Sequence, residues 1–369
     1  MGNDSAKDLW GQIFGKMAKE ACATVVDPSH DVIQDETRLR AALRHAGWPA
    51  ALIESQLAFH RADASAAPVT SPGVNPHVEA HLARLCDEVK ETMDVLGFAS
   101  HTQVARGVEP RTVPFASLIN VIMTDESILT VGAFLFRFCG LVARAFTRTL
   151  MIDPYAWEAQ SLAGKVPPGL MAKRPDVLGY WIRIFISFAA TGTHILVPFR
   201  PATPKELLLF EQVARAMELF AIAHEYGHHH FKHGREMGDD PILHEFEADR
   251  FAVRITYELE KVPLIAPNPY LSSGAGAVVL LRALTILREV RGALETQPEV
   301  SAETHPTVED RTARLDTALT MVAEDYIRQR NFRLVAGNIM DVVATSIATA
   351  LKALTPELRK SLGQLTEAT

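Results

Sequence analysis

The residue types best suited to chemistry in this chain are two histidines and a glutamate close together in the sequence, His224, Glu225 and His228. On a helix, side chains four positions apart share one face, so both imidazoles can reach one metal ion. Glu225 then lies beside the open position of that ion. A zinc ion held by two histidines and one carboxylate keeps a water as fourth ligand and lowers the pKa of that water from near 16 to about 7. The motif therefore indicates metal-assisted hydrolysis.

The third ligand must come from elsewhere in the chain. The metzincin arrangement is excluded, because its glycine and third histidine would fall where Phe231 and Gly234 stand. A helix that begins near position 240 would place Glu245 and Asp249 on one side, because they are one turn apart. Glu245 can then bind the metal while Asp249 accepts the distal N–H of a ligating imidazole. Three alternative ligands remain open on spacing alone: Glu247, His244 and His233.

Two helices must position these side chains. Thr203, Pro204 and Glu206 are typical of the N-cap, the first helical residue and the capping-box partner of the first helix. Apolar residues then recur with a period near 3.6 up to the histidines, and Gly234 is typical of a C-terminal stop. At about 1.5 Å per residue, this helix would span roughly 45 Å and cross the domain. The Asp-Pro pair at 240–241 predicts the start of the second helix.

Three motifs in this order make the sequence resemble the CAAX prenyl endopeptidase and HtpX-type zinc metallopeptidases. The order in that family is an HExxH helix, an E-x-x-A-D segment that supplies the third ligand, and an H-P-x(4)-R signature. The chain carries all three, at His224–His228, at Glu245–Asp249 and at His305–Pro306 with Arg311. The segment 120–135 is similar only loosely to the strand and loop that precede the active helix in the family.

The resemblance implies a role for each matching residue. The ligands that it implies for one Zn²⁺ ion are His224, His228 and Glu245. Glu225 would be the general base, and Asp249 would orient a ligating imidazole. His305 would hydrogen-bond the tetrahedral intermediate, and Arg311 would support His305. Many relatives embed the catalytic domain among membrane spans, and that property does not transfer, because charged residues interrupt the longest apolar runs of this chain.

The rest of the chain predicts a predominantly helical α+β protein, with a zincin-like metallopeptidase domain that combines a small sheet with the HExxH helix. A linker at 64–76, rich in Ala, Ser and Pro, separates an N-terminal helical region, 1–75, from the metallopeptidase domain, 76–369. Strands are predicted at 113–123, 127–131, 180–188 and 193–199. Helices are predicted at 77–96, 276–294, 308–329, 339–354 and 356–365. The strand at 193–199 is the expected edge to which an extended substrate would add.

Composition and charge favour a cytoplasmic, soluble enzyme. The 369 residues are 48% hydrophobic and 22% charged, enough for one large or two modest domains with a core. The net charge of −7 gives no electrostatic reason to bind nucleic acid. Arg137, Arg144 and Arg183 break the apolar runs, so no membrane span is expected. The three cysteines lie far apart and are typical of reduced thiols, and the first residues show no secretory signal.

The sequence thus predicts a zinc-dependent endopeptidase that acts on a protein or peptide, and it leaves the oligomeric state open. One alternative is a regulatory protease similar to the antirepressor and phage-exclusion metallopeptidases, which cleave one dedicated protein. The short interval between His228 and Glu245 favours it, and the His305–Pro306 signature disfavours it. Another is a non-catalytic scaffold tied together by the metal. Glu225 argues against a scaffold, because structural zinc sites normally close all four positions with protein ligands.

Overall fold

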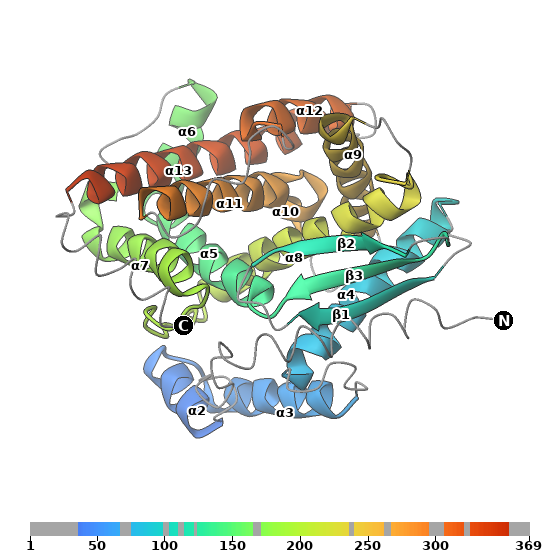
Figure 1. Cartoon of the computed structure of the whole chain (residues 1–369). Helices are drawn as coiled ribbons and strands as arrows, with labels where there is room; N and C mark the ends of the chain where they lie inside the picture. Colours follow the sequence, from blue (N-terminus) through green and yellow to red (C-terminus); the bar gives the residue numbers. More distant parts are fainter. Residues whose placement is uncertain are drawn as a thin grey trace.

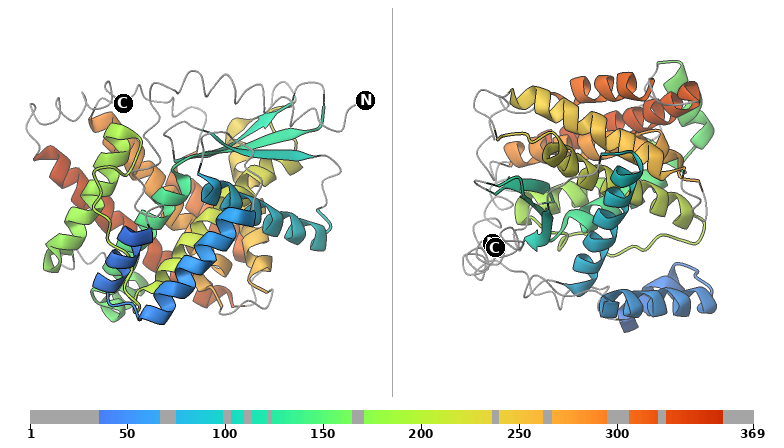
Figure 2. Two further views of the ribbon diagram at one scale, coloured as in Figure 1. Left: turned by 90° about the horizontal axis from the view of Figure 1, so that it is seen from below. Right: turned by 90° about the vertical axis from the view of Figure 1, so that its right-hand side faces the viewer.

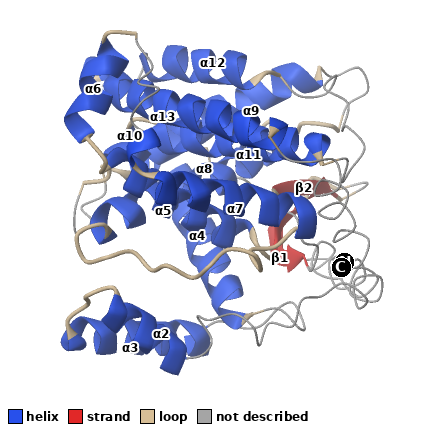
Figure 3. Cartoon of the chain, turned by 90° about the vertical axis from the view of Figure 1, so that its left-hand side faces the viewer, coloured by secondary structure: helices blue, strands red, loops and turns tan. Residues whose placement is uncertain are grey.

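The computed structural model describes residues 36–66, 75–98, 103–109, 114–121, 124–164, 171–235, 240–261, 267–294, 306–320 and 325–353. Within these ranges, helices make up most of the molecule and a small sheet lies at one side of them (Figures 1 and 3). The prediction of a predominantly helical α+β protein is therefore confirmed. The helices in chain order are α2 (Glu36–His45), α3 (Ala50–Ala66), α4 (Pro76–Val95), α5 (Leu135–Leu150), α6 (Pro154–Leu162), the 3₁₀ turn η2 (Met171–Lys173), α7 (Pro175–Thr191), α8 (Leu207–His230), α9 (Pro241–Leu259), α10 (Pro269–Ser272), α11 (Ala275–Ala293), α12 (Val308–Thr320) and α13 (Tyr326–Lys352).

The sheet has three strands in the order β1-β3-β2. Their bounds are Val104–Glu109 for β1, Ala116–Asn120 for β2 and Ser127–Gly132 for β3. The central strand β3 is buried along its whole length, pairs in parallel with β1 and pairs antiparallel with β2. The hydroxyl of Thr130 donates a hydrogen bond of 2.6 Å to Glu109 Oε1 across the sheet. β2 and β3 match the strands predicted at 113–123 and 127–131, whereas β1 was not predicted.

The predictions of strands at 180–188 and 193–199 are wrong. Residues 180–188 belong to α7, whose buried apolar side chains recur every three or four residues, as on a helix enclosed by neighbours. A short, nearly continuous apolar run fits a buried strand and a buried helix equally well, and here the helical packing prevails. Gly192 ends α7 in the left-handed region, at φ 67°.

The segment 193–199 forms turns and not a strand, so it offers no edge to a substrate. The hydroxyl of Ser187 donates to the carbonyl of Thr193 at 2.8 Å and accepts from the backbone N–H of Leu196 at 3.1 Å. These bonds hold the segment after Gly192 against α7. Backbone groups that an extended strand would offer to a sheet are therefore used locally.

Helix α8 lies in the middle of the fold and packs against α4, α5, α9 and α11, and it also touches β2. It begins at Leu207, a little later than predicted, because residues 204–206 form a turn. The predicted capping contact is nevertheless present, since the backbone N–H of Thr203 donates to Glu206 Oε2 at 2.8 Å. The helix ends at His230, and Lys232 and Gly234 follow with φ of 58° and 71°. The motif histidines therefore lie in the last turns of α8.

Most of the other predicted helices are present. The ranges 77–96 and 276–294 correspond to α4 and α11, and Gly274 precedes α11 with a φ of 71°, which glycine adopts without strain. The range predicted as one helix at 308–329 contains all of α12 and the start of α13. A new helix starts there because the side chain of Asp325 accepts from the N–H of Arg328 at 3.4 Å. The helix predicted at 356–365 lies outside the described residues.

Two hydrophobic clusters stabilise the described chain. The large one contains side chains of the helices between α4 and α13 in the sequence and of the sheet. The small one lies between α2 and α3, which Figure 2 shows beside the main group of helices. Phe199 and Leu207 pack against this small cluster, and the indole of Trp48 donates a hydrogen bond of 2.8 Å to the carbonyl of Ala202. The N-terminal helices therefore contact the segment that leads into α8.

One helix of the described chain, α13, is long and apolar enough to cross a membrane by length and composition. About a third of the apolar window is buried inside the fold, at 33%, and its inner side chains pack against α11, α6 and α7. A core helix of a folded domain meets the same criterion. The absence of a membrane span therefore stays a prediction.

Candidate metal centre

The centre forms where α8 and α9 approach each other closely. Gly227 permits this approach, because a Cβ at position 227 would lie 2.9 Å from Ala248 Cα and 3.2 Å from the Ala248 carbonyl oxygen. The start of α9 is fixed as the sequence predicted, with Asp240 Oδ1 accepting from the N–H of Ile242 at 2.9 Å and Pro241 in the first turn. The result is that one face of α8 and one face of α9 oppose each other at a backbone contact.

Potential ligand atoms of three residues converge from these two faces. His224 Nε2 lies 3.1 Å from His228 Nε2 and 3.5 Å from Glu245 Oε2, while His228 Nε2 lies 3.5 Å from Glu245 Oε1. Two ligands about 2.05 Å from a tetrahedral zinc ion are about 3.3 Å apart, which is close to these separations. The two histidines face different oxygens of Glu245, and one ligand atom from each of the three residues lies within 4.8 Å of the others. His224 and Glu245 are each only 8% exposed. The predicted ligand set is brought together as one group that could hold a metal ion.

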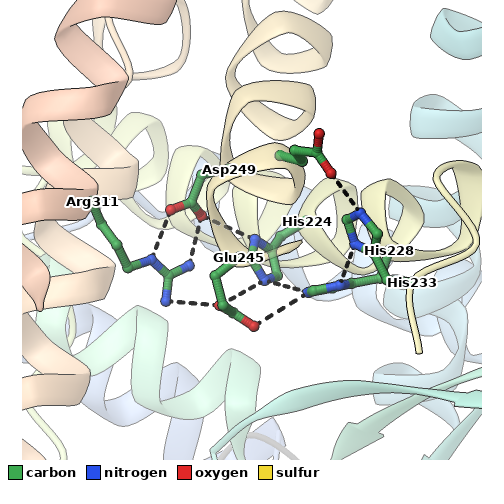
Figure 4. A network of polar contacts seen from close by, with 7 residues as sticks. His224, His228, His233, Glu245, Asp249 and Arg311 are labelled. Carbon is green, nitrogen blue, oxygen red and sulfur yellow. Dashed lines mark hydrogen bonds and ion pairs between the residues drawn. The ribbon is translucent and has the colours of Figure 1, made fainter. Parts of the chain in front are cut away.

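Asp249 lies behind His224, as predicted for a carboxylate that orients a ligand. Its Oδ1 is 3.0 Å from His224 Nδ1, so the other ring nitrogen, Nε2, faces the metal position (Figure 4). Arg311, in the first turn of α12, donates to both oxygens of Asp249 at 2.7 and 2.6 Å and lies 3.2 Å from Glu245 Oε2. The guanidinium of Arg311 thus contacts both Glu245 and Asp249, the carboxylate behind His224.

The electrostatics of the metal-free centre follow from this network. Burial alone would lower the pKa of His224, but the hydrogen bonds and charges of Asp249 and Glu245 outweigh it and raise the pKa to about 10. Burial likewise opposes ionisation of Asp249, yet Arg311 and His224 hold its pKa below the usual range. Without metal, therefore, a proton occupies the place on His224 that a metal ion would take.

Glu225 has a different environment from Glu245 and Asp249. It is 8% exposed, and burial raises the pKa of its carboxyl despite the nearby His224 and His228. A carboxyl group with a raised pKa accepts a proton more readily than an ordinary glutamate does. Glu225 is next to His224 in the helix, and its role as general base stays a prediction.

None of the alternative ligands joins the triad. Glu247 contacts His233 instead, with its Oε2 3.1 Å from His233 Nε2. The Nδ1 atom of His233 in turn lies 2.9 Å from His228 Nδ1. His244 stacks on His233, with ring centroids 4.0 Å apart. Burial lowers the pKa of His233. The sequence analysis considered His233 only as an alternative ligand and did not predict these contacts.

The end of α8 is also tied to the sheet. His229 Nδ1 lies 2.8 Å from Ser127 Oγ, and burial lowers the pKa of His229 to about 4, so the ring is neutral. Asn120 donates from Nδ2 to the carbonyl of His233 at 2.9 Å. Arg235 donates to the carbonyls of Thr124 and Glu126, on the turn between β2 and β3. The sheet therefore fixes the helix end that carries the ligands.

His305 lies outside the described residues, so its predicted contact with a reaction intermediate stays a prediction. The contacts described for Arg311 are with Asp249 and Glu245, and its predicted support of His305 stays open for the same reason. Comparison of the chain with models of known families, with curated proteins and with solved structures finds no match in any of the three.

Proposed function

We propose that the protein is a zinc-dependent metalloendopeptidase. The observation that carries the proposal is the convergence of His224, His228 and Glu245 within 4.8 Å of one another, with the buried carboxyl of Glu225 on the neighbouring helix position. Three protein ligands leave one tetrahedral position for water, which distinguishes catalytic from structural zinc sites. A scaffold site would have no use for Glu225. The proposal that the substrate is a peptide bond rests on the resemblance to the HtpX-type peptidases.

Each residue of the centre has a part in the proposed reaction. A bound zinc ion would supply Lewis acidity for the scissile carbonyl and an acidic water. Glu225 would accept a proton from a water molecule at the metal position and would return that proton to the leaving amine. Asp249 fixes the orientation of His224, and Arg311 holds Asp249 and Glu245. His305, on the resemblance alone, would donate a hydrogen bond to the oxyanion.

Strand β2 replaces 193–199 as the proposed substrate edge. It is an outer strand of the sheet and touches α8, the helix that carries the histidines. Figure 1 shows β2 running along the side of the sheet nearest α9. An extended peptide that adds to an edge strand forms main-chain hydrogen bonds with it, and its side chains alternate between the two faces. The backbone of such a peptide would then lie close to the candidate metal centre.

The test compares the wild type with Glu225→Gln on a library of denatured cellular proteins, and new N-termini are identified by mass spectrometry. We expect equal zinc content in both proteins, and loss of cleavage by a factor of about 10² to 10⁴ in the variant. Cleavage at the wild-type rate by Glu225→Gln would exclude the assigned base. Zinc-loaded wild type that produces no new termini would contradict the endopeptidase itself. His305→Ala, measured in the same way, tests the oxyanion role.

A further inference from the structure

The two ligating histidines are supported in different ways. His224 meets a carboxylate directly, since Asp249 Oδ1 lies 3.0 Å from its Nδ1. His228 instead meets a second imidazole: its Nδ1 lies 2.9 Å from His233 Nδ1, and His233 Nε2 lies 3.1 Å from Glu247 Oε2. Figure 4 shows these contacts continuing outward from the centre through His233. The second ligand therefore reaches a carboxylate through one intervening ring.

The direction of both hydrogen bonds follows from the ligand role of His228. Its Nε2 faces Glu245 and His224, and a nitrogen that binds a metal ion carries no proton. The proton of the neutral ring must then be on Nδ1, which donates to His233 Nδ1. His233, having accepted at Nδ1, carries its own proton on Nε2 and donates it to Glu247. Each donor in this chain of contacts then meets an acceptor, and the last acceptor is Glu247 Oε2.

This contact depends on where α8 ends. In a continuing helix, a residue five positions after His228 would lie about 140° around the axis and could not reach it. Here the backbone N–H of His233 returns to the carbonyl of His228 at 3.0 Å, after Lys232 has taken a φ of 58°. A non-glycine residue rarely adopts that conformation. The end of the helix thus brings the His233 ring back beside His228.

The surroundings hold His233 in one orientation. Its side chain is 6% exposed and stacks on His244 with the ring planes only 8° apart. The carbonyl of His233 accepts from Asn120 Nδ2 at 2.9 Å, which attaches this residue to the end of β2. Glu247, on α9, is partly exposed at 32%. The ring is therefore enclosed on the side of the ligands and connected to the surface through Glu247.

We propose that His233 and Glu247 are positioning residues that fix the tautomer and ring orientation of His228 for metal binding. The inference rests on the metal centre of the proposed function and does not depend on the bond that the enzyme cleaves. Such partners behind a ligating imidazole contribute a factor of about 10 to 100 to metal affinity. The pair would do for His228 what Asp249 does for His224.

The first test is the affinity for Zn²⁺, measured by competition with a chromophoric chelator at fixed pH. His233→Ala and Glu247→Gln are each expected to weaken zinc binding by about 10 to 100 fold. His233→Asn should recover much of the loss from His233→Ala, because its amide oxygen stands where Nδ1 accepts the proton of His228. In the His233→Asn background, Glu247→Gln should add almost nothing, since the contact that links the two is gone.

The matched control is Glu258→Gln, which removes another carboxylate from α9. Glu258 pairs with Lys261 at 3.0 Å, and no contact joins it to the ligands in the described chain. Its zinc affinity should equal that of the wild type. Unfolding of each metal-free protein is measured alongside. Zinc affinity that stays at the wild-type value in His233→Ala and Glu247→Gln, while the metal-free variants melt lower, would assign the pair a structural role and overturn the proposal.

A second test observes the tautomers directly and needs no enzymatic activity. Zinc-loaded Glu225→Gln protein with ¹⁵N-labelled histidine is examined by long-range ¹H–¹⁵N correlation. We expect the proton of His228 on Nδ1 and that of His233 on Nε2. The opposite tautomer of His233 would contradict the inference even if the protein proved to be a peptidase, and failure to cleave peptides would leave this result intact.

Discussion

Arg311 holds Asp249 through two parallel hydrogen bonds, from Nε to Oδ2 at 2.7 Å and from Nη2 to Oδ1 at 2.6 Å. This geometry is the strongest that a guanidinium and a carboxylate form, and Asp249 is only 1% exposed. The remaining nitrogen lies 3.2 Å from Glu245 Oε2. The orientation of His224 and the placement of Glu245 therefore depend on one side chain of α12.

Replacing Arg311 by Met should destabilise the metal-free protein by about 3 to 5 kcal/mol, because it removes the guanidinium that pairs with the buried carboxylates of Asp249 and Glu245. Zinc affinity should fall as well. The measurement is chemical unfolding together with zinc competition. Arg174→Met is the control, since Arg174 forms a similar two-pronged contact with Asp176 at 2.8 Å, but with both side chains about half exposed, at 48% and 50%. Its loss should cost at most about 1 kcal/mol. Equal costs for the two variants would contradict the importance of burial.

Gly227→Ala should separate the two ligand-bearing helices. The added methyl would lie 2.9 Å from Ala248 Cα, a backbone atom that cannot move without shifting α9. We expect weaker zinc binding and lower stability. Zinc competition measures the first, and thermal unfolding measures the second. The comparison is Gly179→Ala in α7, where the added methyl would meet no atom within 4 Å. That change should be neutral or stabilising by up to about 1 kcal/mol, because alanine favours a helix. A Gly227→Ala protein with wild-type zinc affinity would show that the close approach is unnecessary.

Zinc binding should strengthen as the pH rises. The pKa of His224 in the metal-free centre is about 10, so a proton must leave this ring before a metal ion can bind. Between about pH 7 and 10 the apparent affinity should gain up to about tenfold per pH unit from this group, with a proton released on binding. Calorimetry in buffers of different ionisation enthalpy counts that proton. An affinity independent of pH would contradict the raised pKa.

His224 gives the stability of the metal-free protein the opposite dependence on pH. A pKa raised from 6.5 to about 10 on folding stabilises the folded state fully below about pH 6.5, and this contribution is lost as the pH approaches 10. Chelator-treated wild type should therefore become less stable over this range. His224→Gln should lack that part of the slope, and the two pH profiles of unfolding are compared.

Removing the metal should weaken the packing of α8 on α9. Zinc at 100 times its Kd would stabilise the protein by about 2.7 kcal/mol if it binds only the folded state, and an excess of chelator should reverse this. Glu245→Gln should abolish most of the zinc-dependent rise in Tm, because it removes one ligand charge. A rise in Tm that persists in this variant would place the zinc elsewhere.

Local patterns in the sequence were sufficient for the parts of the site that lie within helices. The spacing of His224, His228, Glu245 and Asp249 predicted which side chains share a face, and the cap at Asp240 predicted where the second face starts. The contact between His228 and His233 could not be predicted in this way. It requires a change of backbone direction at Lys232, and nothing in the type of that residue indicates a left-handed conformation.

The errors in the fold have a similar origin. The apolar run at 180–188 was assigned to a strand, because its length alone does not distinguish a buried strand from a buried helix. β1 was missed because Arg106 and Gly107 interrupt its alternation, and it becomes a strand by pairing with β3. Both outcomes were decided by neighbours distant in the sequence. The approach of α8 to α9 at Gly227 depends equally on tertiary packing.

The hydrogen bond from Trp48 to the carbonyl of Ala202 has a practical consequence for shortened forms of the protein. A fragment that began at residue 76 would leave that carbonyl without its donor and would uncover Phe199 and Leu207, just ahead of the helix that carries both histidines. Removal of α2 and α3 would then weaken the packing of the segment before α8. A recombinant fragment designed around the three motifs alone would lose these contacts.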